Sequence, residues 1–482
     1  MSTKHALVGF VAVLGALGFM AGGAAAQETW TPTGDMVIER RDHIATLLID
    51  GRVLIVGWYT RLAELYDPGT GTFSPAGYTL FSHGQGPTAT RLLDGRVLIV
   101  GGDSSVTFTE IYDPLTGNFS QTGSLNVARR AHTATLLADG RVLIAGGLDA
   151  SSTGTLASAE LFDPAAGTFT FAGNLNIARF AQTAALLPNG KVLVAGGEYI
   201  LSPGFAGVLS SAELFDPLSD TFSPTGDLTT ARCCAGSTET QVLGNGKALV
   251  LGGFGAEAGD LYDPATGTFS ATGNLNIRRG VPSASLLPDG RVLVAGGAIT
   301  LPDGTAATTN TAETYDPATD TFTQTASMNQ ARQQHAATRL SNGQVLVTGG
   351  GAIGSSEFGL KSAELFSITA TVAIDIKPEG FPNSIYPGRM ARIPVAILTS
   401  DTFDASSVDA TTVRFGATGS GAAPAHWALE DVDGDRDADM ILQFNIQDTG
   451  IVCGTTAASL TGQTIDGQTI KGSDSIRTVG CQ

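Results

Sequence analysis

The chain has 482 residues, of which 62 are glycine and 15% are charged, and its formal net charge is −18. An acidic protein without a basic stripe is a poor candidate for binding nucleic acid or anionic lipid, so we expect neither as a partner. Hydrophobic residues make up 42% of the chain, which is ample for packed β-domains.

The first 26 residues have the form of an export signal. Lys4 and His5 precede an apolar run that ends at Met20, and three alanines, residues 24–26, supply small side chains before a cleavage point. The run is short for a membrane span, and no later segment resembles one. We expect a signal peptide over residues 1–26 and a secreted or periplasmic mature protein without a membrane span; the alternative is an uncleaved anchor.

One sequence phrase returns seven times in the segment that we assign to residues 27–368. Each copy places an Asp-Gly or Asn-Gly turn between two β-rich runs, and a third run follows that mostly ends in Asp-Pro. The turn glycines are Gly51, Gly95, Gly140, Gly190, Gly246, Gly290 and Gly343. Both turn types join antiparallel strands. A repeat of roughly 40–50 residues built from such runs predicts a β-propeller with one four-stranded blade per copy, and therefore seven blades.

The last copy lacks its fourth strand, whose aromatic residue the other six copies carry (Phe73, Phe119, Phe169, Phe222, Phe269 and Phe322). The segment around Trp30 matches the segment around Phe222 in the fourth copy. We therefore expect the N-terminal strand to complete the last blade and close the ring, which removes exposed sheet edges.

The repeat resembles the kelch family and the kelch-type central domain of galactose oxidase. The resemblance rests on six diglycines and on the third-strand aromatic, and it implies the propeller fold but no single activity. The diglycines begin at Gly101, Gly146, Gly196, Gly252, Gly296 and Gly349. The copper-radical site of galactose oxidase needs a Tyr-His dipeptide among its ligands, and no tyrosine here precedes a histidine. We therefore expect no copper.

Residues 369–482 contain β-runs without the repeat phrase, and we expect a separate β-sandwich-like module there. Cys453 and Cys481 both lie in it and are candidates for a disulfide. The fold class expected for the whole chain is all-β: a seven-bladed kelch-type β-propeller followed by a small β-sandwich-like domain.

An acidic run in this module, residues 431–439, resembles bacterial calcium-binding loops. Its carboxylates stand at alternate positions: Asp431, Asp433, Asp435, Asp437 and Asp439. The resemblance implies a calcium site in which Asp437 supplies its backbone carbonyl and the other four their side chains. Arg436 occupies a position where such loops usually have glycine. The alternative is a solvated acidic turn.

Arginine recurs before the first strand of six copies, at Arg40, Arg129, Arg179, Arg232, Arg279 and Arg332. A ring of arginines at one mouth of the channel would attract an anionic ligand, and Arg129, Arg179, Arg232 and Arg332 are candidates for binding it. The alternative, which the matching periodicity favours, pairs each arginine with the acidic residue of the third strand (Glu64, Glu110, Glu160, Glu213, Asp260, Glu313 or Glu364).

Three histidines, His43, His132 and His335, follow these arginines at one equivalent position. Imidazoles near a channel mouth are candidate metal ligands. A structural role as a repeat feature is the alternative, and it is the one we favour. The pair Cys233-Cys234 lies in the corresponding loop of the fifth copy, as a strained disulfide or as two buried thiols, and the sequence leaves this open.

The loops between second and third strands vary in length and should share one face with the arginine loops. Aromatic residues on this rim are candidate ligand contacts: Trp58, Tyr59, Tyr199, Phe205 and Phe254. We therefore expect a binding module for an extracellular glycan or protein rather than an enzyme. The alternative is a carbohydrate-active enzyme or a galactose-oxidase-like copper oxidase, against which the missing ligand set counts.

Overall fold

The computed structural model describes residues 27–481, apart from 58–59, 85, 103–104, 150–153, 203–204, 233–237, 254–256, 356–358, 379, 381 and 401–402. The predicted signal peptide lies outside the described residues. Within them the chain is almost entirely β-structure, with two 3-10 turns, η1 (Ala405–Ser407) and η2 (Ile446–Asp448). No helix of the described part is long and apolar enough to cross a membrane.

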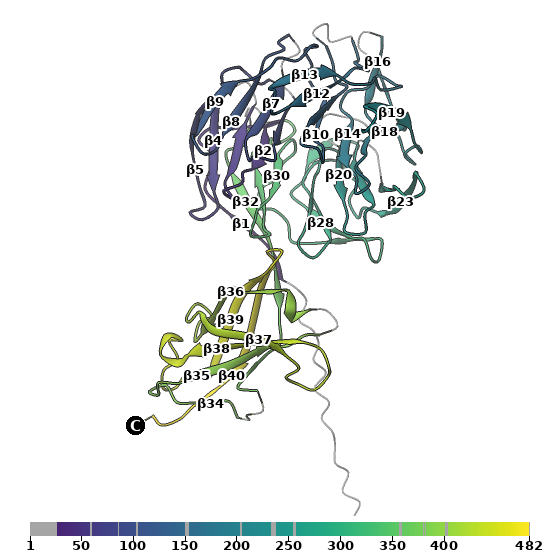
Figure 1. Ribbon diagram of the computed structural model, residues 1–482. Coiled ribbons are helices and arrows are strands. Elements are labelled where there is room, and N and C mark those ends of the chain that lie inside the picture. The colour runs from purple at the N-terminus through teal and green to yellow at the C-terminus, as the bar shows by residue number, and fades with distance from the viewer. Residues whose placement is uncertain are drawn as a thin grey trace, which may run out of the picture.

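The larger of the two lobes in Figure 1 is a ring of seven four-stranded antiparallel sheets, as predicted. Blade 1 consists of β2 (Ile44–Leu47), β3 (Val53–Val56), β4 (Leu62–Asp67) and β5 (Thr72–Tyr78). Blade 2 consists of β6 (Pro87–Arg91), β7 (Val97–Gly101), β8 (Thr109–Asp113) and β9 (Asn118–Gln121). Blade 3 consists of β10 (Thr133–Leu136), β11 (Val142–Ala145), β12 (Ala159–Asp163) and β13 (Thr168–Phe171).

The next three blades follow the same order along the chain. Blade 4 consists of β14 (Thr183–Leu186), β15 (Val192–Ala195), β18 (Ala212–Asp216) and β19 (Thr221–Pro224). Blade 5 consists of β20 (Thr238–Val242), β21 (Ala248–Gly252), β22 (Ala258–Asp263) and β23 (Thr268–Asn274). Blade 6 consists of β24 (Ser283–Leu286), β25 (Val292–Ala295), β28 (Ala312–Asp316) and β29 (Thr321–Gln324).

Two of the variable loops form hairpins of their own. They are β16 (Glu198–Ser202) with β17 (Phe205–Val208), and β26 (Ala298–Thr300) with β27 (Ala306–Thr308).

The second strand of each blade is buried along its whole length, which explains why its sequence is almost entirely apolar. In blades 1–6 the third-strand aromatic contacts the fourth-strand phenylalanine, with ring centroids 4.8–4.9 Å apart. The repeated phrase therefore encodes one packing unit six times.

Blade 7 closes the ring with both ends of the repeat array. It consists of β30 (Ala336–Arg339), β31 (Val345–Thr348), β32 (Ala363–Thr371) and the N-terminal β1 (Gln27–Pro32). Strand β1 pairs antiparallel with β32, from Gln27 opposite Thr369 to Pro32 opposite Glu364. Trp30 packs on Phe366 at 5.1 Å and so takes the place of the fourth-strand phenylalanine. The predicted closure is what the structure shows.

The smaller lobe is a β-sandwich. One sheet consists of β32, β40 (Thr469–Ser475), β39 (Ala457–Thr464) and β36 (Val408–Gly416). The other consists of β33 (Ile374–Ile376), β35 (Arg392–Ile397), β38 (Asp439–Asn445) and β37 (Pro424–Glu430), and a short sheet pairs β34 (Ser384–Ile385) with β41 (Arg477–Thr478). A single apolar core lies between them, and a disulfide joins Cys453 to Cys481.

One strand belongs to both lobes. Strand β32 pairs with β31 in blade 7, and its last residues, Thr369–Thr371, pair in parallel with β40 of the sandwich. The predicted boundary between residues 368 and 369 falls inside this strand. The narrow waist in Figure 1 is thus a continuous β-connection rather than an irregular linker.

Candidate active site

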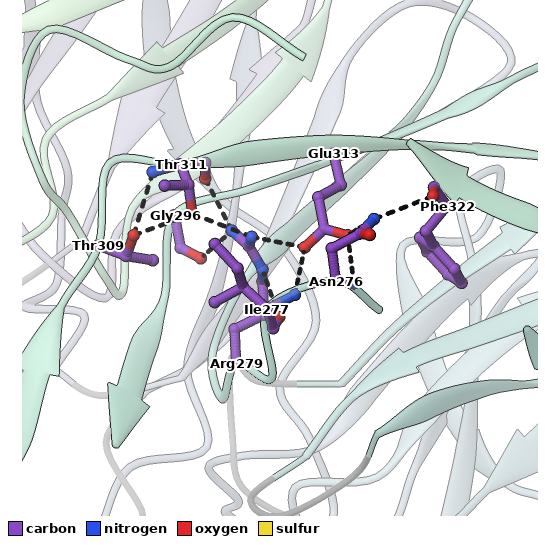
Figure 2. Close-up of polar contacts among 8 residues, drawn as sticks. All are labelled: Asn276, Ile277, Arg279, Gly296, Thr309, Thr311, Glu313 and Phe322. Carbon is purple, nitrogen blue, oxygen red and sulfur yellow. Dashed lines mark hydrogen bonds and ion pairs between the residues drawn. The ribbon is translucent and has the colours of Figure 1, made fainter. Parts of the chain in front are cut away.

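The recurrent arginines are buried, and each clamps the loop that enters its blade. In Figure 2 the guanidinium of Arg279 donates to Glu313 at 2.8 Å and to the carbonyls of Gly296 and Thr311 at 3.0 and 2.7 Å. Glu313 also accepts the backbone N–H groups of Asn276 and Ile277. We call this arrangement the arginine clamp; a multiply bonded pair of this kind is how a buried charge is compensated.

The clamp also joins neighbouring blades. While the side chain bonds within its own blade, the backbone carbonyl of the arginine accepts the second glycine N–H of the preceding blade's diglycine. This bond measures 2.9 Å from Gly147 to Arg179 and 2.8 Å from Gly350 to Arg40. The first glycine is needed for close approach, since a Cβ on Gly101 would lie 2.5 Å from the carbonyl oxygen of Arg129.

These contacts decide between the two interpretations of the arginine series. The four arginines predicted to bind a ligand, Arg129, Arg179, Arg232 and Arg332, are at most 1% exposed and are paired with Glu160, Glu213, Asp260 and Glu364. They lie inside the blades, so no surface ligand reaches their guanidinium groups. The alternative, an acidic partner for each arginine, is what the structure shows.

Two residues after five of the six arginines, the backbone turns into the left-handed region. The φ angle is 48° at Asp42, 52° at Ala131, 55° at Ala181, 53° at Val281 and 54° at Gln334. Such angles are uncommon outside glycine and are strained for valine, and strained backbone concentrates at functional sites. Nothing in the sequence indicated this series, because alanine and valine carry no turn signal.

Some of these left-handed residues are joined around the ring by backbone hydrogen bonds. Ala181 donates to the carbonyl of Ala131 at 2.9 Å, and Asp42 to that of Gln334 at 2.9 Å. Ala131 donates to Gly86, the equivalent residue of blade 2, at 3.2 Å. These tips come from five different blades and so surround the end of the central channel.

The tips and the first inner-strand residues line a cavity of about 410 Å³, which we call the axial cavity. Its polar lining consists of Asp42, His43, Arg130, His132, Gln182, Gln334 and His335, and its apolar lining includes Pro87 and several alanines. The size and the mixture of apolar wall with a few polar groups are typical of a small-molecule site.

The three histidines of the cavity are neutral, and each forms a hydrogen bond to the neighbouring blade. Each places Nε2 on a hydroxyl of the preceding blade, at 2.8 Å (His43 to Thr348), 3.0 Å (His132 to Thr88) and 2.8 Å (His335 to Ser283). Burial, with a smaller effect of neighbouring arginines, lowers the pKa of each histidine to about 3. They therefore line the site as uncharged hydrogen-bonding groups.

Among the described residues that line the cavity, Asp42 is the only carboxylic acid. Burial raises the pKa of Asp42 to about 6, against the smaller lowering effects of Arg41 and of a 3.0 Å hydrogen bond from Gln334 Nε2. A carboxyl group whose pKa is raised to about 6 in a concave site is a candidate acid–base residue.

The rim aromatics are only partly placed. Tyr199 and Phe205 lie on the β16–β17 hairpin, where Phe205 is 71% exposed. Trp58, Tyr59 and Phe254 lie outside the described residues, as do Cys233 and Cys234.

In the described part of the chain, the group of three potential metal ligands is Asp431, Asp433 and Asp439, in the predicted calcium loop. Asp435 and Asp437 do not join this group. Asp431 accepts the backbone N–H groups of Gly434 and Arg436, and Asp439 those of Thr399 and Val432. Backbone N–H groups thus occupy part of the hydrogen-bonding capacity of Asp431 and Asp439, while the calcium site itself stays a prediction.

No protein-family model matches the chain, and no curated protein matches it significantly. Among solved structures, it is similar to one described as a novel fungal alcohol oxidase with catalytic diversity among the AA5 family, in complex with copper. The two share 18% identity with a TM-score of 0.58, over 93% of this chain and 99% of that one. The chain thus has a galactose-oxidase-like, propeller-based fold.

This comparison corrects two expectations. The similar structure is an enzyme, so it counts against the binding-module hypothesis and favours the enzymatic alternative. Its metal is copper, so the expectation of calcium as the cofactor and of no role for copper is also overturned.

The described residues do not by themselves fit a copper centre. Copper sites in proteins need several converging imidazole, thiolate or similar ligands. The cavity histidines are not among the side chains that converge on one point, and no described tyrosine lines the cavity. We therefore derive no chemical step through copper.

Proposed function

We propose that the chain is an enzyme, that the axial cavity is its active site, and that its substrate carries hydroxyl groups, as an alcohol or a carbohydrate does. The observation that carries this proposal is Asp42, a carboxyl group with a pKa of about 6 in a cavity whose other polar groups are Arg130, two glutamines and three neutral histidines. The substrate class is suggested by the alcohol oxidase of similar fold.

In this proposal Asp42 handles the proton of the substrate hydroxyl. Above pH 6 its carboxylate accepts that proton, and below pH 6 it holds one to donate. Gln334 fixes the carboxyl group through its 3.0 Å hydrogen bond, while His43 and His335 offer hydrogen bonds without competing for the proton, because they are neutral.

We also infer that the protein works outside the cytoplasm. The sequence of residues 1–26 supports export, and the disulfide between Cys453 and Cys481 suits an oxidising compartment.

The test is turnover by the purified mature chain on a panel of primary alcohols, monosaccharides and oligosaccharides. The protein is assayed as isolated, after loading with Cu²⁺ and after chelation, with hydrogen peroxide, reducing ends and product mass as readouts. We expect turnover of a hydroxylated substrate, and Asp42→Asn should lower it by about 10²-fold or more.

Asp50→Asn is the matched control, because Asp50 is an exposed acid of the same blade, ion-paired with Arg52 in the turn before β3. It should leave turnover unchanged. Peroxide formation that requires copper would identify an oxidase, whereas turnover indifferent to copper would identify acid–base chemistry alone. Failure of the whole panel under all metal conditions, or full activity of Asp42→Asn, would overturn the proposal.

A further inference from the structure

Blade 2 anchors its entry loop differently from the six blades with an arginine clamp. Its clamp position is His83, which is 1% exposed. His83 Nε2 lies 2.6 Å from Glu110 Oε1, and Nδ1 lies 2.9 Å from the carbonyl oxygen of Gly101. Glu110 Oε2 accepts the N–H of Leu80, as the acidic residue does in the other blades. Two contacts from an imidazole therefore replace the four or so that a guanidinium makes, for example from Arg129.

The two contacts of His83 require that the His83–Glu110 pair carry one proton more than a neutral histidine and an ionised glutamate do. A carbonyl oxygen only accepts, so Nδ1 must carry a hydrogen to bond to Gly101. The 2.6 Å contact then needs a second hydrogen, either on Nε2 or on the carboxyl group of Glu110. Without it, a nitrogen lone pair faces a carboxylate oxygen in a buried site, which is repulsive.

The charged groups that the structure places beside this loop are engaged elsewhere; Arg61 of blade 1 donates its Nε–H to the carbonyl oxygen of Thr79. The titratable side chains packed around the neighbouring glycines are His132, whose ring lies against Gly101, and His43, whose backbone lies beside Gly57. Burial lowers the pKa of both to about 3, so both stay neutral. Arg40 and Arg129 in the adjacent blades are already bonded to Glu64 and Glu160. An arginine clamp has no such dependence, since guanidinium does not lose its proton in proteins.

This loop forms part of the axial cavity. Gly86 and Pro87 line it, and the carbonyl of Gly86 accepts the N–H of Ala131 from blade 3. We propose that the proton shared by His83 and Glu110 holds the entry loop of blade 2 in a pH-dependent way. While the proton is present, Gly86 and Pro87 are held in place in the cavity wall. When the proton is lost at high pH, this part of the wall loosens before the equivalent loops of the other blades. The inference does not depend on which reaction the cavity performs.

The sign of the effect follows from proton linkage. Above the range in which histidine ordinarily titrates, about pH 5–8, the opened loop carries neutral histidine and ionised glutamate, and so binds one proton fewer than the closed loop. Closing of the loop therefore binds a proton. The equilibrium constant for closing falls by up to about tenfold for each unit by which the pH rises.

The test is hydrogen exchange by mass spectrometry on the full mature chain, with rates corrected for the intrinsic pH dependence of exchange. The blade 2 segment 80–92 is compared with the equivalent blade 6 segment 276–287 at about pH 6 and about pH 9. We expect protection of 80–92 to fall at least tenfold relative to 276–287 as the pH rises. His83→Gln, which does not titrate, should show equally weak protection at both pH values.

Arg129→His provides the converse variant, because it places the same histidine opposite Glu160 in blade 3. It should transfer the pH dependence to segment 125–137 while leaving 276–287 unchanged. Protection of 80–92 in the wild type that does not change with pH, or an identical pH response in His83→Gln, would overturn the proposal. If exchange depends on pH as expected but the wild type turns over no substrate of the panel, only the proposed function is contradicted.

Discussion

Replacing Asp42 by asparagine should stabilise the protein above pH 6 while it removes the proposed acid–base group. The pKa of Asp42 is raised from 3.8 to about 6, mainly by burial, so the fold favours the protonated carboxyl group. Stability from this group is fully present below about pH 4 and is lost as the pH rises through about 6. A shift of about two units corresponds to about 3 kcal/mol at most, and asparagine, which does not ionise, avoids this loss.

We therefore expect Asp42→Asn to raise the free energy of unfolding by about 1–3 kcal/mol at pH 8 and by little at pH 4. The lower value of this range allows for the partial exposure of the Asp42 side chain, because water reduces the cost of its charge. The amide oxygen of asparagine still accepts the hydrogen bond from Gln334. Urea unfolding at both pH values measures the difference, with Asp50→Asn as the exposed control. An equal effect at both pH values, or destabilisation at pH 8, would show that Asp42 is not a desolvated carboxylate.

Three further predictions concern the scaffold. Arg279→Met should cost about 3–5 kcal/mol in urea unfolding, because it leaves Glu313 buried without its cation. Gly101→Ala should destabilise by several kcal/mol more than the roughly 1–2 kcal/mol of Gly117→Ala, since both have positive φ but only Gly101 meets the backbone of the next blade. Replacing Cys453 and Cys481 together by serine should lower the stability of the sandwich by about 2–4 kcal/mol, seen as faster exchange at residues 450–481 while the blades are unaffected.

The propeller could be predicted in detail because its information is local and repeated. A turn such as Asp139-Gly140 fixes a hairpin, and the same third- and fourth-strand aromatics recur in blade after blade. Even the long-range pairing of β1 with β32 was foreseeable, because Trp30 carries the motif that the last copy lacks. What the repeat does not specify is the shared strand β32, since a parallel pairing with β40 leaves no periodic signal.

The candidate site was harder to predict, for physical reasons. An arginine in a loop looks the same whether it faces solvent or a buried glutamate, so only the matching period of Glu160, Glu213 and their equivalents favoured the clamp. The left-handed angles of Ala131 and Val281 are imposed by tertiary hydrogen bonding and close packing, and their side chains give no sign of it. His83 could have been found, because it lies within one residue of the position at which the other copies have arginine.

The two functional inferences share one structural logic. Loops of five blades line the axial cavity, and a feature repeated in most blades, such as the arginine clamp, is structural. Chemistry that must act at one point has to come from a position where one copy departs from the others. Among the described left-handed residues around the cavity, Asp42 alone is ionisable, and among the described clamp positions His83 alone is a histidine rather than an arginine. They belong to blades 1 and 2, which are neighbours, and the inner strands of these blades, β2 and β6, lie side by side. Both proposed proton sites, Asp42 and the His83–Glu110 pair, thus lie on the same side of the cavity. The repeated arginine clamps of the other blades hold the rest of the ring in place.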